Sequence, residues 1–269
     1  MGAGMGYIMR YIPSSFASVT RANIGVCFPH LSAEEQDALA NQSMVETMIQ
    51  SLEILRAWGK PANDSAAEVI EEEGLELLLD YEAQEKGFII LVPHIGNWEI
   101  LIYRMARDHE PTVIYQPPKE PALDEFILNA RQKNPSIKLV PTNHRGVAQL
   151  LKTVKKGGMV GILPDQNPDA RDAPFAPFFG HPAQTVGLVN TLVQRTGCNV
   201  VMGYVVRIKG GYKLIFSKPA DPAIGDEDEA IGLAALNNSV QAVVERFPEQ
   251  YQWEYKRFKR QPPGYPKIY

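Results

Sequence analysis

Short, mostly apolar runs alternate along much of the chain with segments in which apolar residues recur every three or four positions. Apolar runs of this length are typical of strands buried on both faces, and the longer recurrence is typical of amphipathic helices. The runs predict strands over residues 88–92, 112–115, 137–140, 159–163, 199–207 and 212–216. The recurring segments predict helices over residues 97–107, 122–133, 146–156, 185–195 and 229–246.

Strands that alternate with helices at this spacing are joined by crossover connections, which place neighbouring strands parallel in one sheet. The pattern therefore predicts the α/β fold class, with a mainly parallel, mixed sheet flanked by helices. The last two strands are separated by Gly210 and Gly211, and we expect them to pair as a hairpin at one edge of the sheet.

The chain before residue 87 follows a different pattern, with helical recurrence over residues 21–58 and 75–85. We expect an N-terminal helical subdomain over residues 1–86, packed on an α/β body over residues 87–269, within one structural domain. The three glutamates at residues 71–73 are expected on a solvated face of this helical part.

Composition and charge exclude several classes of protein. With 45% hydrophobic and 22% charged residues among 269, the chain has the composition of a folded globular protein. The net charge of -4 provides no overall positive field for binding nucleic acid. The two cysteines, Cys27 and Cys198, form no Cys/His cluster, which argues against structural zinc and favours a reducing compartment. No stretch reaches the roughly 18 apolar residues of a membrane-spanning helix.

The clearest candidate catalytic residues directly follow the first buried run of the body. They are His94 and, five residues later, Glu99. Active sites in such sheets gather at the carboxyl ends of the strands. On one continuous helix the two side chains would point about 140° apart, so they converge only if His94 precedes the helix. A carboxylate that fixes an imidazole leaves its other nitrogen free to take a proton from a hydroxyl. Spacing alone leaves open a second interpretation, a loop histidine bonded to backbone and a glutamate placed for the helix dipole.

The residues Pro-His-Ile-Gly-Asn-Trp-Glu at 93–99 resemble the H-x4-D/E motif of the glycerolipid acyltransferase superfamily. More narrowly, they resemble the lipid A biosynthesis acyltransferases, the late lauroyl and myristoyl transferases of Gram-negative bacteria. Further segments resemble other motifs of that family: Arg21–Pro29, Ile162–Gln166, Phe178–Gly187 and Pro248–Lys259. Together these segments extend over nearly the whole chain.

The resemblance implies a catalytic set in which His94 is the general base and Glu99 orients it. It adds Arg131, which would meet the thioester oxyanion or a phosphate, and Asp165, which would support the site from the end of the strand at 159–163. From the residues alone, an exposed helix position for Arg131 and a turn cap for Asp165 stay open. The substrate-binding residues that we expect are Asn97, Gln116, Arg145, Thr185 and Arg257.

Two features depart from the family pattern. Gln116 stands in a Tyr-Gln-Pro sequence where many members have Tyr-Arg-Pro, which removes a charge that would touch substrate phosphate. Only twenty residues precede Arg21, where the family usually has a hydrophobic anchoring helix. We expect either a truncated sequence or peripheral membrane binding. The candidate surfaces for anionic headgroups or an acidic carrier protein are the basic and aromatic segment at 253–260 and the cluster Lys152, Lys155 and Lys156.

The function implied by the resemblance is transfer of a fatty acyl chain from an acyl carrier protein thioester to a hydroxyl of a lipid A precursor. This would take place at the cytoplasmic face of the inner membrane, with no metal and no cofactor. Three alternatives stay open. The same chemistry would serve another acceptor, such as an aminolipid, an aryl polyene glycolipid or a glycerophospholipid. A non-catalytic lipid-binding protein would keep the fold, and a hydrolase would pass the acyl group to water.

Overall fold

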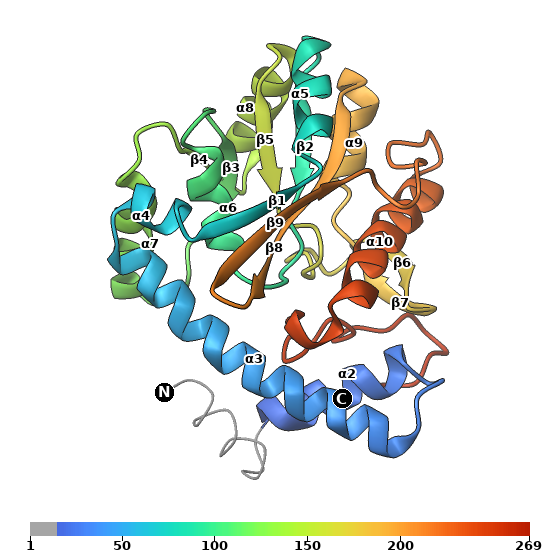
Figure 1. Cartoon of the computed structure of the whole chain (residues 1–269). Helices are drawn as coiled ribbons and strands as arrows, with labels where there is room; N and C mark the ends of the chain where they lie inside the picture. Colours follow the sequence, from blue (N-terminus) through green and yellow to red (C-terminus); the bar gives the residue numbers. More distant parts are fainter. Residues whose placement is uncertain (1–14) are drawn as a thin grey trace. The chain divides into compact units, whose positions relative to one another are not determined.

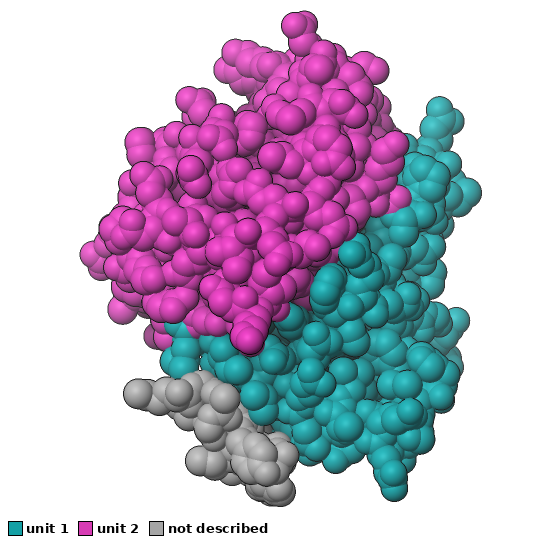
Figure 2. All heavy atoms as spheres, viewed as in Figure 1, with its two compact units in different colours: residues 1–52, 164–190, 220–269 teal, residues 53–163, 191–219 magenta. Residues whose placement is uncertain are grey.

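The computed structural model describes residues 15–269 (Figure 1), and these residues form two compact units. Unit 1 comprises the described residues up to Leu52, residues 164–190 and residues 220–269, and unit 2 comprises residues 53–163 and 191–219. Figure 2 shows the two units in separate colours. Most of the segment before Arg21, where the family resemblance suggests an anchor, lies outside the described residues.

Unit 2 contains one seven-stranded sheet in the order β1-β9-β8-β2-β5-β3-β4. All of its pairings are parallel except the antiparallel hairpin of β8 and β9, which confirms the predicted fold class. The strands are β1 (Val69–Glu73), β2 (Phe88–Leu91), β3 (Thr112–Tyr115), β4 (Lys138–Pro141), β5 (Met159–Ile162), β8 (Asn199–Ile208) and β9 (Gly211–Ser217).

Helices flank this sheet at the crossovers. Helix α6 packs against α4 and β8, and α8 packs against β3, β4 and β5. The apolar side chains of α6 join those of the fully buried strand β2 in the core of the unit. The helices are α4 (Ala62–Ala66), α5 (Leu75–Ala83), α6 (Trp98–Met105), α7 (Pro121–Gln132) and α8 (His144–Lys155).

The glutamates at residues 71–73 are exposed, as expected, but they lie on a strand, β1, and not on a helical part of the chain. The residues of this strand are largely exposed and lack the alternation of apolar and polar positions that marks a half-buried strand. It forms because its backbone pairs in parallel with β9, and Lys213 of β9 forms ion pairs with Glu73 at 2.8 Å and Glu71 at 3.9 Å. As a result β1, and not the predicted hairpin, forms the edge of the sheet.

Unit 1 is mainly helical. It contains α2 (Ser15–Cys27), α10 (Glu229–Arg246), the short 3-10 helix η1 (Pro248–Gln250) and a two-stranded sheet of β6 (Phe175–Phe178) and β7 (His181–Gln184). Two helices contribute to both units, since α3 (Ala33–Gly59) and α9 (Leu188–Thr196) cross the boundaries between the segments.

The hairpin of β6 and β7 was not predicted, because its strands are short and the expected helix over residues 185–195 covered the sequence that follows. Helix α9 starts only at Leu188. The turn of the hairpin places two successive residues, Phe179 and Gly180, at positive φ of 50° and 75°. Helix α10 packs against β6, which supports the hairpin from one side.

Within residues 15–269, every helix is too short or too polar to traverse a lipid bilayer.

Candidate active site

The loop between β2 and α6 carries the motif that the sequence analysis singled out. Strand β2 ends at Leu91, His94 lies in the loop, and Glu99 lies in the first turn of α6, with Asn97 at the position that caps this helix. His94 therefore precedes the helix, which is the arrangement that the spacing requires if the two side chains are to converge. His94, Asn97 and Glu99 are all buried.

Two contacts with strand β8 fix the shape of this loop. Gly96 has a positive φ of 52° and forms an isolated bridge with Val205, and the backbone N–H of Asn97 donates to the Val205 carbonyl at 3.0 Å. A Cβ atom at residue 96 would lie 1.9 Å from the Val205 carbonyl oxygen, so only glycine fits. The loop is therefore held by backbone geometry as well as by side chains.

Glu99 forms a buried, two-pronged ion pair with Arg131 of α7. The Nε atom of Arg131 donates to Oε2 of Glu99 at 3.1 Å, and its Nη2 atom donates to Oε1. Burial lowers the pKa of Arg131, but the charge and hydrogen bonds of Glu99 outweigh this effect and raise it overall. Both residues are among the site residues expected from the sequence, but their pairing with each other was not expected.

Two tyrosines, Tyr103 and Tyr115, lie near this ion pair. The guanidinium of Arg131 lies 5.2 Å from the centre of the Tyr115 ring, and the Tyr115 hydroxyl donates to Asp124 at 2.6 Å. Burial, together with this bond to Asp124, raises the pKa of Tyr115 to about 12. The buried hydroxyl of Tyr103 has no hydrogen-bond partner among the described residues.

Neither tyrosine is among the site residues expected from the sequence. Tyr103 follows Glu99 by four positions on one helix. This spacing places both side chains on the same face and is a signal that could have identified Tyr103 from the sequence. Tyr115 ends strand β3, at the same edge of the sheet as the His94 loop, but strand position alone does not distinguish it from its neighbours.

An apolar cavity adjoins the candidate active site. The His94 ring packs edge-on against Trp98, with ring centres 4.8 Å apart, and Trp98 lines the cavity. The free volume of about 20 Å³ is too small for a fatty acyl chain in this conformation. The lining residues, which come from α6 and the neighbouring strands and loops, are Ile90, Val92, Trp98, Leu101, Ile102, Met105, Pro111, Val113, Met159, Gly161 and Leu163.

Two of the predicted substrate-binding residues lie on the surface of unit 2. Gln116 is exposed in the loop after β3. Arg145 is exposed in the first turn of α8, where the Asn143 side chain caps the helix by accepting from the backbone N–H groups of Arg145 and Gly146.

The other predicted residues, Asp165, Thr185 and Arg257, belong to unit 1 and are buried there. The Arg257 guanidinium donates to the hydroxyl of Thr185 and to the side-chain oxygen of Asn237, each at 3.3 Å. Burial lowers the pKa of Arg257. Burial, followed by the charge of Asp165, raises the pKa of Tyr251 well above its usual value.

The basic and aromatic segment at 253–260 was expected to form a binding surface, but two of its aromatic rings are not exposed to solvent. Trp253 and Phe258 are buried, because they pack against other aromatic rings of unit 1. Lys256 and Lys259 remain exposed. Arg257 was expected to bind a substrate, but its guanidinium donates hydrogen bonds to groups of its own unit.

Neither a metal site nor a reactive thiol is found among residues 15–269. No group of three or more His, Cys, Asp or Glu side chains in this part of the chain is arranged to hold a metal ion. Both cysteines are buried free thiols, and burial raises the pKa of each, which disfavours the nucleophilic thiolate.

Comparison with known proteins gives one consistent family. The family model described as bacterial lipid A biosynthesis acyltransferase matches residues 1–260. The lipid A biosynthesis lauroyltransferase and the palmitoleoyltransferase of Escherichia coli (strain K12) are each 26% identical to this chain, over 100% of it and 87% of their own length. The lipid A biosynthesis myristoyltransferase of the same organism is 23% identical over 90% of this chain and 75% of its own length.

The buried Glu99–Arg131 pair generates a stability prediction. Arg131→Met leaves the Glu99 carboxylate buried without its cation, and we expect the free energy of unfolding to fall by about 3–5 kcal/mol. The double variant Glu99→Leu/Arg131→Met removes both charges, and we expect it to recover most of this loss. Urea denaturation measures both effects.

Arg145→Met serves as the control, because it removes an exposed arginine and should change the free energy of unfolding by less than about 0.5 kcal/mol. A single Arg131→Met variant as stable as the control would contradict the pairing.

Proposed function

The chain belongs to the bacterial lipid A biosynthesis acyltransferase family and is an acyltransferase, and from this premise we propose that it moves a fatty acyl chain from acyl carrier protein to a lipid A precursor. In this reaction the acceptor hydroxyl attacks the acyl thioester directly, without an acyl-enzyme intermediate. The observation that carries the proposal is the position of His94, which lies in a rigid loop at the carboxyl end of β2, next to a helix whose first turn carries Glu99.

His94 acts as the general base. Its imidazole takes the proton from the acceptor hydroxyl as the oxygen bonds to the thioester carbonyl carbon, and the carbon–sulfur bond then breaks. The imidazolium returns the proton to the departing thiolate, so the products are an ester and a thiol. The carboxylate of Glu99 favours the imidazolium through its negative charge, and Arg131 holds that carboxylate in a fixed position.

Arg131 also provides a positive charge beside the reaction. The ion pair with Glu99 occupies its Nε and Nη2 atoms, and we assign its remaining terminal nitrogen to the thioester oxyanion or to a substrate phosphate. The supporting role of Asp165 and the substrate contacts of Thr185 and Arg257 rest on the family resemblance.

The charge of one segment supports a carrier protein as the donor. Between Glu125 and Asp165 the sequence contains no acidic residue, although the whole chain has a net charge of -4. Lys152, Lys155 and Lys156, on α8 and directly after it, are exposed. A surface of this kind attracts an acidic protein and orients its approach. The seven basic residues of the segment are Arg131, Lys133, Lys138, Arg145, Lys152, Lys155 and Lys156.

The acceptor defines a second candidate function. The relatives are named for lauroyl, palmitoleoyl and myristoyl transfer in lipid A biosynthesis, which supports a lipid A precursor here and leaves the chain length open. The neutral and exposed Gln116 favours an acceptor with fewer phosphates, such as another glycolipid or an aminolipid. We place the reaction at the cytoplasmic face of the inner membrane, where both substrates of the proposed reaction meet.

The first experiment tests transfer and the role of His94 together. The purified chain is incubated with acyl carrier protein thioesters of several chain lengths and a lipid A precursor, while thiol release and lipid mass are followed. We expect the lipid to gain one acyl chain, and His94→Ala to lower the rate by about 10²–10⁴-fold.

His109→Ala is the matched control, because this histidine of the same unit pairs with Glu82, at 2.9 Å, and plays no part in the proposal. Thiol release without acylated lipid would redirect the assignment to another acceptor or to water. Absence of thiol release with any donor, in a folded protein, would favour the lipid-binding alternative.

The basic surface generates a second prediction. Reversing three charges in Lys152→Glu/Lys155→Glu/Lys156→Glu should raise the KM for the acyl carrier protein thioester by about tenfold, because the approach of an acidic partner loses its attraction. The KM for a small acyl-pantetheine thioester should stay unchanged. Steady-state kinetics with both donors gives the comparison.

The matched control reverses three exposed lysines elsewhere in unit 2, Lys86, Lys209 and Lys218, and so gives the same net charge. If this control raises the KM as much as the α8 variant, the effect comes from overall charge, and the assignment of a docking surface fails.

A further inference from the structure

The side chain of Asn97 adopts an unusual arrangement for a residue that starts a helix. Asparagine at this position normally accepts a hydrogen bond from the first turn through its side-chain oxygen, but Asn97 makes no such bond. Its Nδ2 atom instead donates to the hydroxyl of Tyr212 at 3.3 Å. Its Oδ1 atom is buried and has no hydrogen-bond partner among residues 15–269. The amide is therefore turned away from the helix, with its acceptor unused.

The hydroxyl of Tyr212 determines which end of the Asn97 side-chain amide is turned towards it. The residue lies near the start of β9 and is buried, and its hydroxyl is hydrogen-bonded to the carboxylate of Glu53 as well as to Asn97. Burial raises the pKa of Tyr212, with a further contribution from the charge of Glu53, so the hydroxyl keeps its proton. An ionised carboxylate only accepts hydrogen bonds, so the single proton of the phenol goes to Glu53. Towards Asn97 the phenol oxygen can then only accept, and it selects the nitrogen end of the amide.

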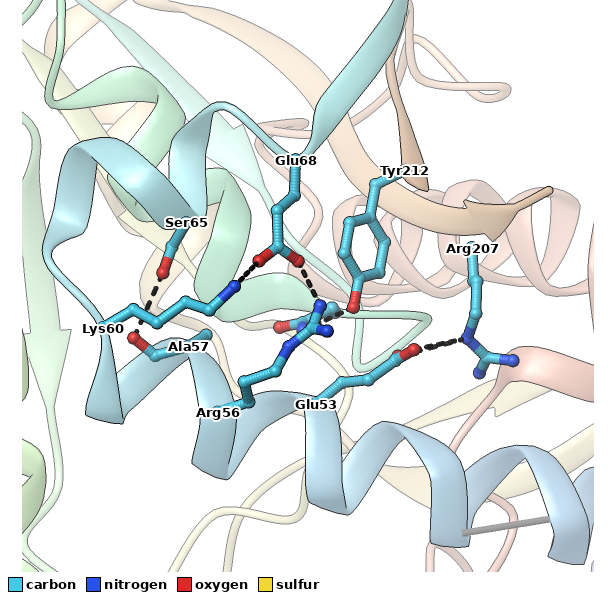
Figure 3. A network of polar contacts seen from close by, with 9 residues as sticks. Glu53, Arg56, Ala57, Lys60, Ser65, Glu68, Arg207 and Tyr212 are labelled. Carbon is cyan, nitrogen blue, oxygen red and sulfur yellow. Dashed lines mark hydrogen bonds and ion pairs between the residues drawn. The ribbon is translucent and has the colours of Figure 1, made fainter. Parts of the chain in front are cut away.

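The network around Glu53 holds this arrangement in place (Figure 3). Arg207 of β8 donates to Glu53 from its Nε atom, with nitrogen–oxygen distances of 3.0 and 3.1 Å to the two carboxylate oxygens. The neighbouring Glu68 is held separately by Arg56 and by Lys60. Arg207 thus holds the Glu53 carboxylate in position beside the Tyr212 hydroxyl, and this fixes the direction of the hydrogen bonds from Arg207 to Asn97.

We propose that Tyr212, held by Glu53, is a positioning residue that presents the Oδ1 atom of Asn97 as a hydrogen-bond acceptor to a substrate bound beside His94. The ligand group is a polar N–H or O–H, which the acceptor lipid supplies as a hydroxyl or amide and the carrier donor supplies as an amide of its pantetheine arm. A buried acceptor without a partner is unfavourable, and binding of such a group removes that cost. This inference rests on the proposed function, because it requires these substrates.

The experiment measures binding separately from turnover. Calorimetry gives the affinity of the full chain for the lipid A precursor and, in a second arm, for acyl carrier protein whose acyl chain is attached through a stable amide. Tyr212→Phe removes the hydroxyl that selects the nitrogen end and lets the amide rotate. We expect it to weaken the affinity for one of the two substrates by about tenfold, and that substrate is the one that supplies the polar hydrogen.

A double-variant comparison separates positioning from a merely structural role. In an Asn97→Ala background the hydroxyl has no amide to orient, so Tyr212→Phe should then change the affinity by less than about twofold. Glu53→Gln is the second variant, because a glutamine can donate to the phenol and free it to bind the amide oxygen. Glu53→Gln should weaken the affinity for the same substrate. Thermal denaturation should show that this variant is folded.

Tyr81→Phe is the matched control, since it removes a hydroxyl from a half-buried tyrosine of the same unit, on α5. Affinities for both substrates that are equal in the wild type, Tyr212→Phe and Tyr81→Phe would overturn the inference, as would an equal loss with and without Asn97. Failure of the wild type to bind either substrate would overturn it as well. Substrate binding without turnover would instead refute the proposed reaction, while the affinities still decide the role of Tyr212.

Discussion

The ion pair between Glu99 and Arg131 is the constraint on which the rest of the site depends. A carboxylate removed from water is stable only beside a compensating charge, and a bidentate guanidinium provides that charge in a fixed geometry. The pair joins α6 to α7, which are separated in sequence by the whole of β3. The two crossovers that carry the chain from β2 to β4 are therefore needed to form the site as well as the sheet.

The site combines rigid backbone with polar groups that lack partners. Gly96 and Val205 fix the loop through main-chain contacts, so the position of His94 does not depend on flexible side chains. By contrast, the hydroxyl of Tyr103 and the Oδ1 atom of Asn97 are buried and make no hydrogen bond with any of residues 15–269. Natural proteins satisfy most buried polar groups, so each exception calls for an explanation. These two groups therefore lower the free energy of unfolding unless a water molecule or a ligand satisfies them.

Much of this structure is predictable from the sequence, and the features that were not predicted have identifiable physical reasons. The buried strands and the helices between them follow from apolar runs and helical recurrence, and helix α10 has the bounds that its pattern predicts. Strand β1 was not predicted, because its glutamates give no apolar signal and its pairing depends on a partner strand far along the chain. In the same way, spacing identifies His94 and Glu99, but the pairing of Glu99 with Arg131 and the contact of Asn97 with Tyr212 are long-range. Periodicity describes local structure and carries no information about such contacts.

The acidic character of β1 has a consequence for how copies of this chain meet one another. A strand at the edge of a sheet exposes unpaired backbone groups, which invite the edge of another molecule to continue the sheet. Here the exposed edge carries three consecutive glutamates at residues 71–73. A second copy that approached edge to edge would place two such acidic strands side by side, and like charges directly opposite each other are destabilising. The acidic residues of β1 thus disfavour edge-to-edge pairing of two sheets at this strand.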